Sequence, residues 1–400
     1  MGIRVIRGVT RPENAHQARL LRLLRDTGPR SRAELGEAVH LSRSKVAVEL
    51  DRLTDLGLVQ GQGLAASRGG RRSHVVALAD DLRFAGIDIG ATSIDVGVTD
   101  GALRLLAHAS AESDVRRGPG PVLDQALDLL EKLRSEGWAP QLHGVGVGVP
   151  GPVSQLEGAP VVPPIMPGWN HFPLRDTLAA ALGTTVMVDN DVNIMALGEL
   201  HAGTARSVKD FLFIKVGTGI GCGIVIDGQL HRGAGGCAGD IGHIRIEETG
   251  PTCTCGNDGC LEAFFGGAAL ARDAETAARS GRSPALAELL PRRGRLTAVD
   301  VGEAAAAGDP TAVGLIRDGG TRLGFALATL VSFFNPALVV IGGGVAGLGH
   351  RLLAEIRSVV YRRSLPLATG NLPIVLSEMA ERAGVVGGAR LVSDTVFSAP

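Results

Sequence analysis

One histidine and three cysteines lie close together in the second half of the chain. They are His243, Cys253, Cys255 and Cys260, which fall within eighteen residues. One imidazole and three thiolates form the ligand set of a closed tetrahedral zinc site, and the glycines between the cysteines allow turns tight enough to bring the thiolates onto one ion. Four protein ligands leave no position for water, so the pattern predicts a structural zinc ion.

These cysteines could also be chance thiols in a glycine-rich loop, or they could form a disulfide. Cys253 and Cys255 are too close in the sequence to bridge comfortably, and thiols stay reduced in the cytosol, so we favour zinc over both. A zinc-dependent hydrolase is disfavoured because the ion would be fully liganded by protein. Zinc here would instead fix the geometry of Asp240, His243 and Glu262. The remaining two cysteines, Cys222 and Cys237, have no partner at metal-ligand spacing and are expected to be small core residues.

A pair of polar residues, Asn190 and Asp191, ends a predicted buried strand that starts at Val186 and precedes a predicted helix over residues 192–202. The helix dipole favours an ionised carboxylate at this position. Asp191 could act as a base that takes the proton of an attacking sugar hydroxyl, with Asn190 bonding the same sugar. The alternative is an ordinary helix cap, which the position by itself favours over the role of a base.

Three glycine-rich turns each follow a predicted strand. They are Asp88-Ile-Gly-Ala-Thr92, Gly217-Thr-Gly-Ile-Gly221 and Gly342-Gly-Gly344. Backbone N–H groups without side chains can approach a phosphate closely, and Asp88 could orient Mg²⁺. Each glycine run alone could reflect close packing. Together the strand and loop units predict two similar halves that face a cleft.

The distribution of charge divides the chain into a head and a body. Residues 1–80 carry 14 Lys+Arg and 8 Asp+Glu, a net charge of +6, whereas the remainder carries 26 and 33, a net charge of −7. A length of 400 residues predicts at least two domains. A basic head on an acidic body indicates that the head meets a polyanion.

The head shows the pattern of three helices. Apolar spacing predicts a helix over residues 14–27, a short second helix capped by Ser31 with Glu34, and a third helix over residues 43–56. The buried side of the third helix is expected to contain Val46, Val48, Leu50, Leu53 and Leu56. This order places short polar and cationic side chains where a helix-turn-helix protein contacts DNA, namely Ser42, Arg43, Ser44 and Lys45.

Two predicted strands follow the third helix, at Leu58-Val59 and at residues 74–78. The loop between them carries Arg68, Arg71 and Arg72, which would touch phosphates or the minor groove. Residues 1–80 are therefore predicted to form a winged helix-turn-helix DNA-binding domain, joined to the body at Asp80-Asp81. The alternative is a small helical cap with a solvated basic face.

No targeting or membrane segment is evident. The N-terminus carries arginines without a following apolar region, and the most apolar stretch, residues 325–348, is interrupted by Asn335-Pro336. We therefore expect a cytoplasmic protein with no membrane partner.

The ordered set of motifs resembles the ROK family (repressor, open reading frame, kinase) within the sugar kinase/actin-like fold. The resemblance covers residues 84–400 and includes the three glycine turns, Asp189-Asn-Asp191, the Gly-His pair at 242–243 and Cys253-x-Cys-Gly-x-x-Gly-Cys-x-Glu262. It implies an α/β body of two lobes. The first would comprise residues 84–188 and a C-terminal helix over 382–396, and the second would comprise residues 189–381.

The resemblance also implies roles for individual residues. Sugar hydroxyls would be held by Asn190, Asp191, Asp240, His243 and Glu262, beside Gly151 in a rigid proline-flanked turn. Asp191 would match the catalytic base of the kinase members. The nucleotide site would comprise Asp88, Gly90, Thr92, Gly217, Thr218, Gly219, Gly343 and Gly344.

The chain departs from the kinase pattern at several positions. Asp240 and Asp189 stand where glutamate is usual, and Ala91 and Ser93 replace the usual glycine and lysine of the first loop. Loss of that cation weakens the electrostatic support for ATP. We therefore expect a sugar-responsive repressor that binds operator DNA as a homodimer or homotetramer. The alternative is a hexose or N-acetylhexosamine kinase that uses ATP and Mg²⁺ and carries a DNA-binding head.

Overall fold

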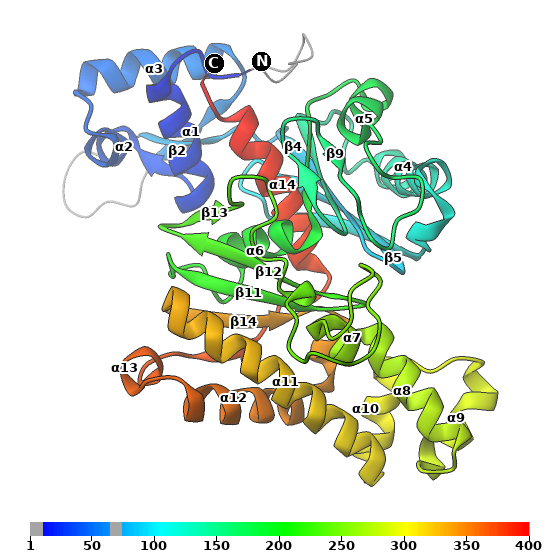
Figure 1. Cartoon of the computed structure of the whole chain (residues 1–400). Coiled ribbons are helices and arrows are strands. Elements are labelled where there is room, and N and C mark those ends of the chain that lie inside the picture. Colours follow the sequence, from blue (N-terminus) through cyan, green and yellow to red (C-terminus); the bar gives the residue numbers. More distant parts are fainter. Residues whose placement is uncertain (1–10, 65–73, 400) are drawn as a thin grey trace. The chain divides into compact units, whose positions relative to one another are not determined.

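The computed structural model describes residues 11–64 and 74–399 and divides the chain into two compact units (Figure 1). The first unit extends to His201 and includes the residues from Gly384 onward, and the second is Ala202–Ala383. Among the described helices, none has both the length and the apolar character needed to span a bilayer.

The head of the first unit contains three helices and a three-stranded sheet of order β1-β3-β2. The elements are α1 (Ala15–Thr27), β1 (Arg30–Ser31), α2 (Arg32–Val39), α3 (Arg43–Asp55), β2 (Val59–Leu64) and β3 (His74–Leu78). Asn14 caps α1, and Ser31 forms the predicted capping box with Glu34. Ser42 caps α3 by accepting the backbone N–H of Lys45. The three predicted helices and the strand over residues 74–78 are thus confirmed.

One predicted core residue of α3 faces solvent. Val48 is 48% exposed, whereas Val46, Leu50 and Leu53 are buried. Residues two apart on a helix point to different sides, so Val48 cannot share the face of Val46 and Leu50. The prediction of a buried Val48 was therefore wrong.

The body of the first unit is built on a five-stranded sheet of order β10-β7-β4-β5-β6. Its strands are β4 (Arg83–Ile89), β5 (Ser93–Asp100), β6 (Leu105–Glu112), β7 (Gly144–Val149) and β10 (Val186–Asn190). It also contains η1 (Val115–Arg117), α4 (Pro119–Ser135), the short pair β8 (Val153–Ser154) and β9 (Ala159–Pro160), α5 (Leu174–Leu182) and α6 (Asp191–Ala202). Strands β4, β7 and β10 run parallel, so their carboxyl ends meet at one edge of the sheet.

The second unit repeats this arrangement with a sheet of order β13-β12-β11-β14-β15. Its strands are β11 (Phe211–Val216), β12 (Ile220–Ile226), β13 (Gln229–His231), β14 (Leu338–Gly342) and β15 (Ile374–Leu376). In both units an antiparallel meander of three strands is extended by two parallel strands. The two halves predicted from the sequence therefore share one strand topology.

Helices make up most of the remainder of the second unit. They are η2 (Ile241–His243), α7 (Leu261–Phe265), α8 (Gly267–Arg279), α9 (Pro284–Arg293), α10 (Ala298–Ala306), α11 (Pro310–Phe334), η3 (Gly344–Leu348), α12 (His350–Arg363) and α13 (Pro366–Thr369). Residues from these helices and from β11, β12, β14 and β15 share one hydrophobic core. This core supports the loops of the candidate site.

The final helix, α14 (Arg382–Val396), packs against the first sheet through glycines. A methyl group on Gly387 would overlap the carbonyl group of Ile194 in α6, and one on Gly146 of β7 would overlap the carbonyl group of Gly388. Only glycine allows main chains to approach this closely. Helices α6 and α14 and strand β7 are therefore held in direct backbone contact.

The outer side of α14 packs against the head. Val392, Val396 and Phe397 belong to one hydrophobic cluster with Leu20, Leu21 and Leu24 of α1. Within the same cluster, Phe84 of β4 and Phe397 meet edge to face with ring centroids 5.6 Å apart. The head and the first lobe thus share a core within one compact unit.

Replacing Gly387 with alanine is expected to destabilise the first unit by roughly 3 kcal/mol, because the new methyl group must displace the backbone of α6. The two tryptophans, Trp138 and Trp169, both lie in this unit, so their fluorescence reports its unfolding in urea. The control is Gly120→Ala in α4, where a methyl group meets open space. It should change stability by about 1 kcal/mol or less. Equal midpoints for the two variants would contradict the packing argument.

Candidate functional site

The structure brings the predicted histidine and cysteine ligands together. His243 ends η2, Cys253 and Cys255 lie in the following loop, and Cys260 caps α7. The distance from Cys253 Sγ to His243 Nδ1 is 3.4 Å and that from Cys255 Sγ to Cys260 Sγ is 3.7 Å. The four ligand atoms all lie within 4.8 Å of one another, so the cluster could hold a metal ion.

The loop that carries these thiols turns through left-handed glycines. Gly256 and Gly259 have φ of +89° and +78°. The Gly256 N–H donates to the Cys253 carbonyl at 2.9 Å, and the Cys253 N–H donates to the Asn257 carbonyl at 2.8 Å. All three cysteines are free thiols in this structure. Of the remaining two cysteines, Cys222 is buried as expected, but the expectation of a buried Cys237 was wrong because that residue is exposed.

The three thiols differ in acidity. Burial raises the pKa of Cys260 to about 12 and also raises the pKa of Cys253. Burial opposes ionisation of Cys255 as well, but the backbone N–H of Asn257 and the neighbouring thiols lower its pKa to about 7. Metal ligation requires thiolates, so metal binding at this cluster would release protons.

Glu262 connects this cluster to the glycine turn that follows β11. Its Oε2 accepts the backbone N–H of Ile220 at 3.0 Å, and its Oε1 lies 3.5 Å from Thr254 Oγ1. A methyl group on Gly219 would overlap the Glu262 carboxylate in its present position. The carboxylate is therefore held between the glycine turn and the cysteine loop.

The two ring nitrogens of His243 face different neighbours. Nδ1 faces Cys253 Sγ, whereas Nε2 lies 3.9 Å from Asp240 Oδ1. One nitrogen is thus placed for a metal ion and the other for a polar group near Asp240. This geometry is compatible with both roles predicted for His243. Asp240, His243 and Glu262 form the second unit's part of the predicted sugar residues.

The first unit's part lies where β10 meets α6. Asn190 Nδ2 donates to the Gly151 carbonyl at 2.7 Å, and Asn190 Oδ1 accepts the Val192 N–H at 2.9 Å. Asp191 Oδ1 also accepts the Val192 N–H, at 2.7 Å, and Asp191 is 7% exposed. The preceding Asp189 accepts a hydrogen bond from Asn193 Nδ2 at 2.8 Å. The structure therefore joins Asn190, Asp191 and Gly151, and it shows Asp191 at the helix start.

The first glycine turn lies at the same sheet edge. Asp88 lies near the end of β4 beside α14, where a methyl group on Gly384 would overlap its carboxylate. The Gly90 N–H donates to the Ser93 carbonyl at 2.8 Å, and Thr92 is exposed. Because β4, β7 and β10 are adjacent parallel strands, their following loops are neighbours. Ligands of open α/β sheets bind at such carboxyl ends.

The second and third glycine turns are neighbours in the second unit. The turn at Gly217, Thr218 and Gly219 follows β11, and Gly343 and Gly344 follow the adjacent parallel strand β14. The Gly217 N–H donates to the Gly219 carbonyl at 2.9 Å, and Gly343 has φ of +86°. A side chain on Gly343 would press on the backbone of Val216 at 2.6 Å. Close backbone packing therefore accounts for part of this glycine pattern.

The predicted DNA-contacting residues of α3 lie at its exposed front. Ser42, Arg43, Ser44 and Lys45 are all exposed. Lys45 Nζ, however, lies 2.7 Å from Oε1 of Glu49, whose side chain is fully buried. The predicted wing residues Arg68, Arg71 and Arg72 fall outside the residues that the structure describes.

Two further residues of α3 lie beside these side chains: Val48, which was expected in the core, and Glu49, which was not predicted from the sequence. Val48 is exposed one turn after Ser44, and Glu49 lies one turn after Lys45 and also accepts hydrogen bonds from Asn14 and Gln17 of the α1 region. The spacing of four residues could have indicated the pair of Lys45 and Glu49. Burial opposes ionisation of Glu49, but hydrogen bonds from Lys45, Asn14 and Gln17 lower its pKa to about 2.

The fold and the clustered residues define a class of two-lobed α/β proteins of the sugar-kinase type. The ROK family profile matches residues 84–395, so the chain belongs to the ROK family. The xylose repressor of Caldicellulosiruptor bescii is 31% identical over 392 residues, which cover 95% of this chain and 96% of that one.

Two solved structures are also similar. A ROK family transcriptional regulator, a homologue of the Escherichia coli MLC protein, has a TM-score of 0.80 at 26% identity and covers 95% of this chain and 96% of its own. A ROK glucokinase from Streptomyces griseus, solved with glucose and AMPPNP, has a TM-score of 0.68 at 32% identity and covers 77% of this chain and 98% of its own. Likeness to the regulator thus extends over nearly the whole chain.

Replacing Glu49 with glutamine is expected to cost about 2 to 3 kcal/mol of head stability at pH 7. The pKa of Glu49 is lower in the folded chain than its ordinary 4.5, so its stabilisation is present above pH 4.5 and is lost as pH falls toward 2. Thermal unfolding of both proteins at several pH values measures the difference, which should shrink below pH 4.5. The control is Glu37→Gln at an exposed site on α2, which should be neutral. A pH-independent difference would contradict this role of the charge.

Proposed function

We propose that this protein is a sugar-responsive DNA-binding transcriptional regulator, and specifically a repressor. The main support for this proposal is the share of the chain over which it is similar to repressors and to kinases. The xylose repressor and the regulator structure cover 95% of the chain, whereas the glucokinase structure covers 77%. The additional coverage includes the basic head, and a catalytic role alone would not require that head.

The head is proposed to bind DNA as a winged helix-turn-helix. Its support is the order of three helices and an antiparallel sheet, with α3 presenting Arg43 and Ser44 at its N-terminus. Arginine forms bidentate bonds with guanine, and the exposed Val48 offers an apolar contact for a thymine methyl group. Lys45, restrained by Glu49, and Ser42 would help to position the helix on phosphates.

Operator DNA would be bound by two heads. Arg68, Arg71 and Arg72 in the predicted wing would contact phosphates or the minor groove. A homodimer or homotetramer would present its heads to half-sites about one helical turn, or a multiple of it, apart. A bound sugar would change DNA affinity only if it binds one conformation of the protein more tightly than another conformation that differs in DNA affinity.

The effector is proposed to be a sugar or sugar phosphate. In the first unit Asn190, Asp191 and Gly151 form one polar group, and in the second unit Asp240, His243 and Glu262 form another. Carboxylates and amides of this kind form hydrogen bonds with hydroxyl groups. The xylose repressor and the glucokinase indicate the sugars with which to begin, D-xylose and D-glucose.

The histidine and cysteine cluster is proposed to hold a structural Zn²⁺ ion. Tetrahedral zinc ligands at ordinary bond lengths lie about 3.8 Å apart for two sulfurs and about 3.6 Å apart for sulfur and nitrogen. The chain supplies four such ligands, with the Cys255 and Cys260 sulfurs 3.7 Å apart and the Cys253 sulfur 3.4 Å from His243 Nδ1. Bound zinc would supply no catalysis. It would tie η2 to α7 and so fix Glu262.

A sugar kinase that uses ATP and Mg²⁺ is the second candidate. It is favoured by the Asp191 carboxylate, which can act as the base, and by the glycine turns after β4, β11 and β14. Against it stand Ala91 and Ser93, which offer no cation to the phosphates. A coupled assay that detects ADP release with a panel of sugars distinguishes this kinase function from a purely regulatory one. Turnover that Asp191→Asn abolishes would make the kinase the principal function.

Purified protein is expected to carry one zinc ion per chain, and Cys255→Ser is expected to lose it because the site then lacks a thiolate ligand. Elemental analysis of reduced protein measures the metal, and thermal unfolding measures its contribution to stability. Cys237→Ser is the matched control, since that thiol is exposed and lies outside the cluster. Full zinc content in Cys255→Ser would contradict the assignment.

A duplex selected from random DNA for binding to the whole protein is expected to lose affinity when the effector sugar is added. Arg43→Ala should weaken binding by about 10-fold or more, because a bidentate base contact is worth roughly 1–3 kcal/mol. Asp191→Asn should keep DNA affinity but lose the sugar response, whereas Asp176→Asn at an exposed site on α5 should keep both. Fluorescence anisotropy measures the affinities. Absence of any sugar response in the wild-type protein would overturn the proposed switch.

A further inference from the structure

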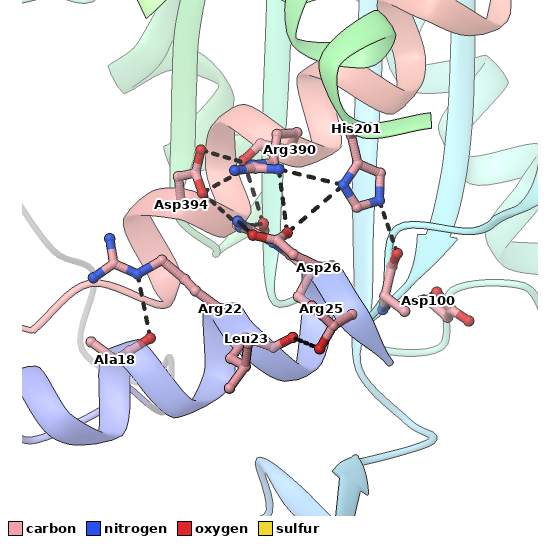
Figure 2. A network of polar contacts seen from close by, with 12 residues as sticks. Ala18, Arg22, Leu23, Arg25, Asp26, Asp100, His201, Arg390 and Asp394 are labelled. Atoms are coloured by element: carbon pink, nitrogen blue, oxygen red, sulfur yellow. Dashed lines mark hydrogen bonds and ion pairs between the residues drawn. The ribbon is translucent and has the colours of Figure 1, made fainter. Parts of the chain in front are cut away.

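A buried arginine of the head is held by the C-terminal helix of the body (Figure 2). The side chain of Arg25, near the end of α1, is 0% exposed. Its Nη1 lies 2.6 Å from Asp394 Oδ1 and donates to Ser393 Oγ at 2.6 Å, both on α14. Its Nε lies 2.8 Å from Oδ1 of the adjacent Asp26. A buried guanidinium is tolerated only with partners of this kind.

A second arginine closes the network from α14. Arg390 Nε lies 3.0 Å from Asp394 Oδ2, and Arg390 Nη1 lies 3.3 Å from Asp26 Oδ1. The four side chains Arg25, Asp26, Arg390 and Asp394 thus balance two positive and two negative charges. We call these four residues the junction cluster. It joins α1 of the head to α14 through charged hydrogen bonds. Arg25 is its fully buried member, whereas the carboxylates of Asp26 and Asp394 are 38% and 39% exposed, so losing a carboxylate would leave the buried guanidinium short of a partner.

Helix α6 ends at the same cluster. Its His201 faces Arg390 Nη1 through Nδ1 at 3.4 Å (Figure 2). Nε2 of the same ring lies 3.1 Å from the Ala102 carbonyl oxygen. Burial and the charges of Arg390 and Arg25 lower the pKa of His201 to about 4, so the ring is neutral at pH 7. The neutral ring donates from Nε2 to Ala102 and accepts from Arg390 at Nδ1.

The opposite end of α6 carries the candidate sugar residues. Asp191 is the first of its twelve residues and Asn190 precedes it, so about 15 Å of helix separates Asp191 from His201. Residues from Asp191 to Glu199 are buried. Gly387 of α14 lies against the backbone of Ile194 and Gly198. A displacement at Asp191 therefore cannot be absorbed by sliding of α6 past α14.

We infer that α6 and the junction cluster are the physical link by which occupancy at Asn190 and Asp191 changes the position of the DNA-binding head. This inference rests on the proposed function and identifies the regulatory path within it. Arg25, Arg390, Asp394 and His201 are positioning residues, since they contact neither group of candidate sugar residues. The shared apolar core holds the head in place. The junction cluster makes the position of the head depend on the position of α6 and α14.

The test measures three quantities for each full-length variant: DNA affinity without sugar, sugar affinity without DNA, and the fold-change in DNA affinity that sugar produces. D-xylose and D-glucose are the probes. In wild type the fold-change is expected to be about 10 or more, within the usual range of coupling. Arg25→Met should keep both affinities within about threefold and reduce the sugar-induced change to about threefold or less.

Arg22→Met is the matched control on the same helix. Arg22 is exposed and its Nε donates to the Ala18 carbonyl of its own helix (Figure 2), so its variant should keep the wild-type response. His201 provides a second test that leaves Arg25 in place. His201→Ala should lose the response, and His201→Gln, whose amide can accept from Arg390 and donate to Ala102, should restore much of it.

The outcomes separate the inference from the function on which it depends. If neither sugar changes the DNA affinity of wild type, the proposed function fails and the inference fails with it. If wild type responds and Arg25→Met or His201→Ala responds equally, the inference alone is overturned. If Arg25→Met does not fold, the two His201 variants decide, and loss with alanine but not with glutamine supports the link.

Discussion

The first unit depends on the close contact of α14 with the main chains beneath it. Gly384, Gly387 and Gly388 lie where any side chain would strike Asp88, α6 or β7. The absence of side chains lets the helix approach within backbone distance, and the packed geometry then fixes Asp88 and the start of α6 together. The predicted phosphate turn and the predicted sugar residues of this unit are therefore positioned by one helix that is distant from them in sequence.

Elements that are determined by residues close together in the sequence could be predicted from it. The capping box at Ser31, the helix cap at Ser42 and the strand over residues 74–78 follow from neighbouring residues, and the structure has them where they were expected. The cluster of His243, Cys253, Cys255 and Cys260 could also be predicted, because ligand type and spacing are contained in one short segment. Its glycines at 256 and 259 adopt the left-handed conformation that such a turn needs.

Features that depend on long-range contacts could not be predicted in this way. Arg25 is buried where its partner is Asp394, which is 369 residues away, and nothing in the arginine-rich sequence of α1 distinguishes it from the exposed Arg22. Val48 was placed in the core and Glu49 was missed for a related reason. Their roles depend on which face of α3 meets α1, and apolar composition alone assigned Val48 to the wrong face. The sequence alone gives no sign that the glycines of α14 are needed for packing, because their partners in β7 and α6 are distant in the chain.

Helix α14 packs against the sheet on one side and against the head on the other, and this indicates whether the head is an independent domain. One side of this helix lies on the sheet through glycines, and Val392, Val396 and Phe397 pack in a cluster with the head. Removing the head would expose these apolar side chains and would leave Arg390 and Asp394 without Arg25 and Asp26. A domain that merely accompanies a catalytic body does not need to complete that body's core. A shared core and shared charges are instead what a protein needs if ligand binding at Asp191 is to change the position of α3.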